Sequence, residues 1–195
     1  MLEIKTKIYP APPINLREVL RYAGVGTADG TTLSLIQDCI KEAEPHLSFR
    51  VCCAEISRSS EYAPLIFGMA GTGEYLSKSE GAVIFVATVG IEIDRLIAKY
   101  SRISASKALL IQAIGAQRIE ALCDVFSREY SDELLGRGYK ALRRISPGYG
   151  SFGLEAQREL FSILELNKRI GLSLNDSLIM SPSKSVTAIF GFEKL

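Results

Sequence analysis

The stretch "ISASKALLIQAIGAQRIEALCDVFSREY", residues 103–130, is the longest helical pattern of the sequence. It spans about seven helical turns, contains no proline and is rich in alanine. Its small residues would let a neighbouring element approach the helix closely; they are Ala105, Ala108, Ala113, Gly115 and Ala116. We therefore expect one long helix against which another part of the backbone packs closely.

The residues immediately before this helix predict a strand, a turn and a second helix. Residues 82–88 form an apolar run typical of a buried strand, and Gly90 marks the turn after it. The helix that follows carries Ile91, Leu96 and Ile97. A glycine-rich segment, "GMAGTGEY" (68–75), precedes the strand, whereas a dinucleotide-binding loop follows its strand and reads G-x-G-x-x-G. A plain loop is therefore the favoured interpretation of this segment.

Nearer the start of the chain, two strands enclose two helices. Residues 3–9 ("EIKTKIY") and 49–56 ("FRVCCAEI") predict the strands. A short helix is expected over 15–24, with Asn15 at its start and Gly24 at its end. "TTLSLIQDCIKEAEPHL" (31–47) predicts a helix with a threonine cap, stopped by Pro45.

The last third of the chain predicts a helix and a terminal hairpin. Residues 154–166 form the helix, with Leu160, Phe161 and Leu164 facing inward. "SLNDSLIM" (173–180) and "SVTAIFGF" (185–192) flank a Pro-containing turn and predict the hairpin. Strands and helices occur in mixed order without a regular βα repeat, so we expect an α+β fold: one domain over 1–195, with an antiparallel or mixed sheet and surrounding helices.

Composition narrows the class of protein. Lys and Arg number 23 against 22 Asp and Glu, so no basic field indicates nucleic acid as a partner. The first residues lack the apolar segment of a signal peptide, and no apolar run is long enough to span a bilayer. The four cysteines form no C-x-x-C pair, and we expect them to be buried thiols in a reducing cytoplasm. With His46 as the one histidine, neither a metal site nor a catalytic residue is predicted.

Two patterns suggest ligand chemistry, each with a purely structural alternative. Glu120 and Asp124 lie four residues apart on one helix face, near Arg118; they form either a solvated face or a carboxylate pair for a cationic ligand. "RRISPGYGSF" (143–152) joins arginines, a Pro-Gly turn and a tyrosine. It is either an ordinary turn, or a place where arginine binds a carboxylate and the tyrosine offers a flat face.

The order of several short motifs resembles a known family. "RISPGYG" is followed by Ile170-Gly171, then "LNDS" (174–177), Met180-Ser181-Pro182 and Ser185-Val186-Thr187. This series resembles the S-adenosylmethionine-binding reactivation domain of cobalamin-dependent methionine synthase. Residues 76–97 are similar to free-standing relatives of that domain. Asn175-Asp176 stands where the family has Thr-Glu. The family also has an aspartate near the start of the domain, which no residue of this sequence clearly matches; Asp29 and Asp38 are the two candidates.

The resemblance implies a set of ligand-binding residues. Arg144 would meet the carboxylate of S-adenosylmethionine, and backbone groups around Ser146 and Gly148 would hold the adenosyl portion. Tyr149 would stand between the ligand and the corrin ring. Glu120 is the best match to the family's helix glutamate and would face the cationic end of the ligand, with Asp124 as second choice.

The function implied is that of a component of a methyltransferase system for methionine biosynthesis, rather than a complete enzyme. Such a protein would bind S-adenosylmethionine and support reductive methylation of cob(II)alamin on a separate corrinoid-binding methionine synthase subunit. A flavodoxin or ferredoxin-type donor would supply the electron. Two alternatives are an activator of another corrinoid methyltransferase, and an interaction protein that kept the fold without the ligand.

Overall fold

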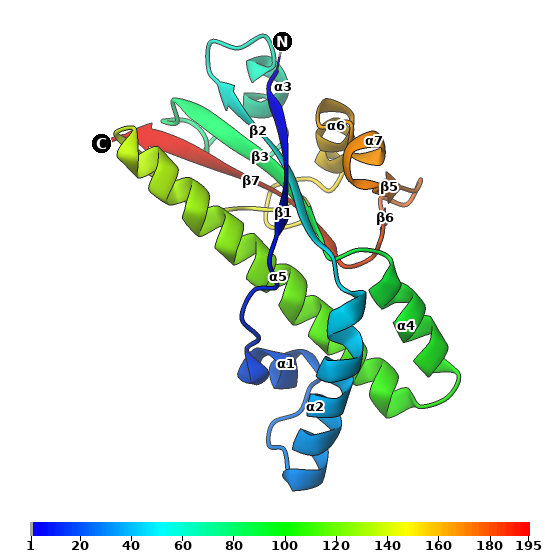
Figure 1. Ribbon diagram of the computed structural model, residues 1–195. Coiled ribbons are helices and arrows are strands. Elements are labelled where there is room, and N and C mark those ends of the chain that lie inside the picture. Colours follow the sequence, from blue (N-terminus) through cyan, green and yellow to red (C-terminus); the bar gives the residue numbers. More distant parts are fainter. Residues whose placement is uncertain (1) are drawn as a thin grey trace.

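Strand β3 (Gly81–Thr88) is buried along its whole length because it lies at the centre of an antiparallel sheet. The computed structural model, which describes residues 2–195, places five strands in the order β1-β2-β3-β7-β4 (Figure 1). The other four strands of this sheet are β1 (Ile4–Tyr9), β2 (Phe49–Ser57), β7 (Ser185–Lys194) and β4 (Tyr139–Ala141). The α+β class with an antiparallel sheet, predicted from the sequence, is confirmed.

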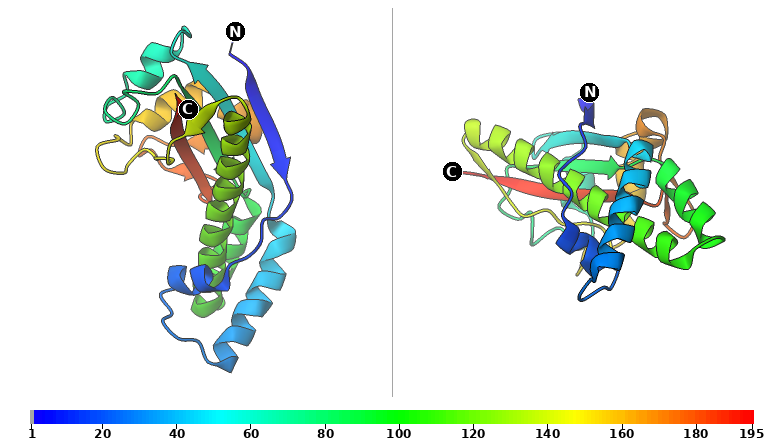
Figure 2. Two further views of the ribbon diagram at one scale, coloured as in Figure 1. Left: turned by 90° about the vertical axis from the view of Figure 1, so that its left-hand side faces the viewer. Right: turned by 60° about the horizontal axis from the view of Figure 1, so that its bottom comes forward.

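Helices cover both faces of this sheet. The helices are α1 (Leu16–Tyr22), α2 (Gly30–Ala43), α3 (Ala63–Phe67), α4 (Glu92–Ser101), α5 (Ala105–Gly136), α6 (Ala156–Ile163) and α7 (Leu166–Ile170), with a short 3-10 turn η1 (Glu44–His46) after α2. The long helix α5 runs along one face and extends beyond the strands, where α1, α2 and α4 gather around it (Figures 1 and 2). The opposite face is covered by α3, α6 and α7.

The alternation of side chains along the strands builds two apolar cores. Val83, Phe85 and Ala87 of β3 point toward α5, whereas Ile84 and Val86 point toward α6 and α7. Adjacent residues Cys52 and Cys53 likewise fall in different cores, as predicted for neighbours on a strand. All four cysteines are buried and free.

Small residues on α5 admit close neighbours, as expected. A side chain at Gly115 would have its Cβ 3.1 Å from the side chain of Lys184, which precedes β7, and 3.3 Å from Ile93 of α4, so glycine lets both side chains lie against the helix. The helix extends beyond the end of the predicted pattern because residues 131–136 continue the α-helix. Leu134, in this extension, is fully buried, so the added turn packs against the core.

The helix caps confirm one prediction and correct another. Asn15 caps α1 by accepting hydrogen bonds from the amides of Arg17 and Glu18. The threonine cap predicted for α2 is wrong: the helix begins at Gly30, and Asp29 accepts a hydrogen bond from Thr32 N instead. A carboxylate is among the preferred caps, and Asp29 lies just before the segment that the pattern indicated.

The predicted terminal hairpin is also wrong. β5 (Ser173–Leu174) pairs with β6 (Met180–Ser181) in a small separate hairpin, whereas β7 enters the main sheet between β3 and β4. β7 has apolar residues on both faces, and in the main sheet both faces are covered while β3 and β4 pair with its two edges. Of the residues predicted to face inward from α6, Leu160 and Leu164 are buried and Phe161 is only half-buried.

Among residues 2–195, no helix is long and apolar enough to cross a membrane.

Candidate ligand-binding site

The sheet places Arg144 opposite the middle of α5. After β4 the chain continues beside β7: Leu142 N donates to Gly191 O at 2.8 Å, and Ile145 exchanges two 2.9 Å backbone hydrogen bonds with Ile189. Arg144 therefore lies on a segment fixed at the edge of the sheet, and its side chain reaches the helix that packs on that face.

Arg144 joins the two carboxylates that helical spacing had placed together. Its Nη2 donates to a carboxylate oxygen of Glu120 and, at 3.3 Å, to Oδ1 of Asp124. The prediction that Glu120 and Asp124 share one face of α5 is confirmed. Arg118, expected near them, points elsewhere: it is fully buried and donates to the carbonyl of Pro12.

The environment of Arg144 keeps its guanidinium charged. Only 21% of its side chain is exposed, and this burial opposes the charged form. The carboxylates of Glu120 and Asp124 act against the effect of burial, and the pKa of Arg144 lies above its ordinary value. The result is a half-buried cation with two partly exposed anions beside it.

The turn after Arg144 is built on a buried proline and a glycine with positive φ. Pro147 is buried and Gly148 has a φ of 91°, a region that glycine adopts without strain. Gly148 N donates to Phe152 O at 2.8 Å, and Tyr149 N donates to Ser146 O at 3.2 Å. This compact turn leaves Tyr149 77% exposed.

A shallow pocket of about 390 Å³ brings most of the predicted site residues together. Its lining consists of Glu120, Arg143, Arg144, Ile145, Ser146 and Tyr149. Gly148 belongs to the same turn but does not line the pocket. The pocket therefore has a charged end at α5 and an aromatic end at the exposed turn.

Glu120 also borders a second, larger groove that sequence reasoning missed. This groove, of about 770 Å³, lies between α5 and the segment leading into α1, and Gln117 lines it. The side chain of Gln117 is buried, and its Oε1 has no hydrogen-bond partner among the described residues. Gln117 lies three residues before Glu120, so helical spacing was the signal that could have identified it.

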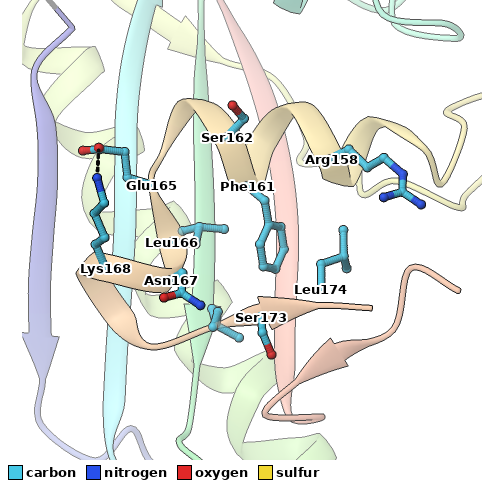
Figure 3. Close-up of a pocket in the computed structure, with 10 residues that line it drawn as sticks. Arg158, Phe161, Ser162, Glu165, Leu166, Asn167, Lys168, Ser173 and Leu174 are labelled. Carbon is cyan, nitrogen blue, oxygen red and sulfur yellow. Dashed lines mark hydrogen bonds and ion pairs between the residues drawn. The ribbon is translucent and has the colours of Figure 1, made fainter. Parts of the chain in front are cut away.

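Another pocket, of about 570 Å³, lies away from these residues, between α6, α7 and β5 (Figure 3). Phe161 stands in its wall, which explains why that side chain is only half-buried. Its carboxylate, Glu165, is paired with Lys168 at 3.3 Å and with Arg169 at 3.1 Å. No residue predicted for the ligand site lines this pocket.

Across residues 2–195, no group of three or more His, Cys, Asp or Glu residues is placed to hold a metal ion. His46 lies exposed at the end of η1.

Comparisons with known proteins point to one family. The family model described as "Vitamin B12 dependent methionine synthase, activation domain" matches residues 74–194. A solved structure, "Crystal Structure of the MetH Reactivation Domain bound to AdoHcy", is similar with a TM-score of 0.70 and 15% sequence identity. The similarity covers 97% of this chain and 78% of that one, and at this identity it establishes the fold.

Proposed function

Because the chain belongs to the family of vitamin B12-dependent methionine synthase activation domains, we propose that it binds S-adenosylmethionine in the pocket between Arg144 and Tyr149. It would do so as a stand-alone subunit that supports reductive methylation of cob(II)alamin on a separate corrinoid-binding methionine synthase. The similar reactivation domain was crystallised with S-adenosylhomocysteine, the demethylated form of this ligand.

The single observation that carries the proposal is the contact of Arg144 with Glu120 and Asp124 at one end of the pocket. The amino-acid end of S-adenosylmethionine carries a carboxylate and an ammonium group, next to a sulfonium. On binding, the ligand carboxylate would take a place on the guanidinium, whose planar fork suits a carboxylate. Glu120 and Asp124 would then face the ammonium and sulfonium, which offsets the cost of desolvating the ligand's positive charges.

The other end of the pocket suits the adenosyl portion and a partner. Ser146 and the backbone of the Pro-Gly turn would hold the nucleoside, with Gly148 shaping the turn from outside the lining. Tyr149 is exposed, and its ring would stand between the ligand and the corrin. A pocket this open leaves the methyl group accessible from the partner's side.

In the reaction that we propose, cobalamin on the partner would be the methyl acceptor: after one-electron reduction of cob(II)alamin by a flavodoxin or ferredoxin-type donor, it would accept the methyl group of the sulfonium, and S-adenosylhomocysteine would be released. The protein's own contribution is position: it holds the sulfonium near the cobalt. Such a transfer would require no acid or base on this chain.

The proposed function has a direct test. This protein, a cob(II)alamin-loaded corrinoid-binding methionine synthase, a reductant and S-adenosylmethionine would be incubated together while the cobalamin absorption spectrum is recorded. We expect methylcobalamin to form, and its formation to require this protein. Calorimetry should detect S-adenosylhomocysteine binding; absence of both binding and methylcobalamin would contradict the proposal.

The alternatives predict different results in the same experiments. An activator of another corrinoid methyltransferase would bind the ligand but methylate only that client, which a pull-down from the native cell would identify. A ligand-free interaction protein is the second alternative, in which the contacts from Nη2 of Arg144 to Glu120 and Asp124 would serve the fold alone. That reading requires that calorimetry detect no binding.

We also propose that residues 1–195 act as one domain in the cytoplasm. The core on the α5 face includes residues from Tyr9 to Phe192, so segments near both ends of the chain pack in the same core. Four buried, free cysteines agree with a reducing compartment.

A further inference from the structure

The glycine-rich segment 68–80 lies directly against the turn that carries Tyr149. Gly71 has a φ of 83°, and a Cβ there would lie 1.9 Å from the carbonyl oxygen of Ser151. Ser151 Oγ donates to Gly71 O at 3.3 Å. The glycine thus permits a backbone-to-backbone contact that no other residue could make without moving the turn.

Tyr75, in the same segment, connects the chain at Arg144 to the sheet. Its hydroxyl donates to the carbonyl oxygen of Arg143 at 2.5 Å and accepts from the amide of Gly191 at 3.3 Å. The hydroxyl therefore joins the peptide group just before Arg144 to β7. It uses one donor and one acceptor function, which phenylalanine lacks.

The segment is itself held in place, so that it can serve as a fixed support. Arg58 donates to the carbonyls of Leu76 (2.6 Å), Ser77 (3.0 Å) and Ser79 (2.7 Å). Leu76 is 1% exposed and packs in the core that also contains Phe152, the residue that closes the Pro-Gly turn. A segment that reads as a plain loop in the sequence is thus an ordered support beneath the pocket.

We propose that Tyr75 is a positioning residue for the ligand pocket: its hydroxyl fixes the peptide that presents Arg144 to the ligand. The inference rests on the proposed function, because it assigns Tyr75 a role at the same site. Gly71 has the complementary role at the other end of the pocket, where it sets the position of the turn that carries Tyr149.

The protonated hydroxyl is available over the working pH range. Burial raises the pKa of Tyr75 to about 12, while the hydrogen bond from Gly191 acts in the opposite direction. The donor function toward Arg143 is therefore present at neutral pH.

The first arm of the test needs no ligand. Amide hydrogen exchange of residues 143–152 would be compared in wild type, Tyr75→Phe and the control Tyr62→Phe, whose ring packs against the same core. We expect faster exchange over 143–152 in Tyr75→Phe alone, with residues 82–88 unchanged in all three proteins. Equal exchange over 143–152 in wild type and Tyr75→Phe would overturn the inference, whether or not the protein binds S-adenosylmethionine.

The second arm separates positioning of Arg144 from general loss of structure. Affinity would be measured for S-adenosylhomocysteine and for 5′-methylthioadenosine, which lacks the amino-acid end. Loss of one hydrogen bond that orders the site should weaken S-adenosylhomocysteine binding about fivefold, with methylthioadenosine binding unchanged. If Tyr75→Phe weakened the binding of both ligands equally, positioning through Arg144 would be contradicted. If the wild-type protein bound neither ligand, the proposed function would be contradicted, and the exchange experiment alone would decide the role of Tyr75.

Gly71 provides an independent variant with a matched control. Gly71→Ala must displace the Ser151 backbone, whereas Gly73→Ala, two residues away, meets nothing within 4 Å. We expect faster exchange over 146–152 in Gly71→Ala and wild-type exchange there in Gly73→Ala. Identical exchange profiles for the two variants would show that the close approach at Gly71 does not position the turn.

Discussion

Arg143 and Arg144 are adjacent in the chain, but only Arg144 contacts the carboxylates of α5. Arg143 is exposed at the edge of the same pocket. We therefore expect Arg144→Ala to weaken S-adenosylhomocysteine binding about 30-fold, since a hydrogen-bonded charge contributes about 2 kcal/mol. Arg143→Ala, the matched control, should change affinity less than about threefold. Calorimetry of both variants measures the difference; equal losses would remove Arg144 from its assigned role.

At the same scale, local spacing predicted one part of the site and missed another. Glu120 and Asp124 could be placed together because the helical repeat fixes residues four apart on one face. The contact of Tyr75 with Arg143 joins positions 68 residues apart in the chain. No local pattern encodes such a contact, because it depends on how the sheet and the loop fold over one another.

Among the elements, the C-terminal end of α5 is joined to β2 by one charged cluster. Glu55 accepts hydrogen bonds from Arg137 Nη1 and Nη2, at 2.7 and 2.6 Å, and from the Tyr130 hydroxyl at 2.9 Å. The hydrogen bonds from Arg137, and secondarily the one from Tyr130, hold the pKa of Glu55 below its ordinary value although burial acts against them. The cluster therefore fastens the last turns of the helix to the sheet in a charge-dependent way.

This cluster predicts a pH-dependent loss of stability. A carboxyl whose pKa is lowered by folding stabilises the protein fully above the ordinary glutamate pKa, about 4.3, and loses that contribution as the pH falls through its folded value. Glu55→Gln should lower the free energy of unfolding by about 2 kcal/mol at pH 7, and this difference from wild type should shrink as the pH is lowered below 4. Urea unfolding over that range measures it. The exposed Glu61→Gln is the control, and a difference independent of pH would contradict the ionic explanation.

Element type was more predictable than element pairing. Buried β3, capped α1 and the long α5 follow from apolar periodicity and from Asn15. The strands with which β7 pairs could not be predicted from the sequence, because a strand with two apolar faces is equally suited to a local hairpin and to the centre of a sheet. The sheet prevails because it gives β7 two neighbours and buries both faces, and the two-residue strands β5 and β6 offer too little pairing to compete.

At the scale of the whole molecule, substitution of the exposed Tyr149 tests whether a residue that contributes little to stability acts on a partner. Because 77% of Tyr149 is exposed, Tyr149→Ala should change the free energy of unfolding by less than about 0.5 kcal/mol. If the ring contacts the corrin of a partner, the same substitution should slow methylcobalamin formation at least about tenfold, as for aromatic residues at the centre of an interface. Tyr149→Phe keeps the flat face and should retain most of the rate. Two measurements distinguish a role in partner contact from a role in ligand binding: the spectroscopic rate with the corrinoid-loaded partner, and the calorimetric affinity for S-adenosylhomocysteine. If affinity falls as much as the rate, Tyr149 acts in ligand binding. If the rate is unchanged, Tyr149 does not contact the partner.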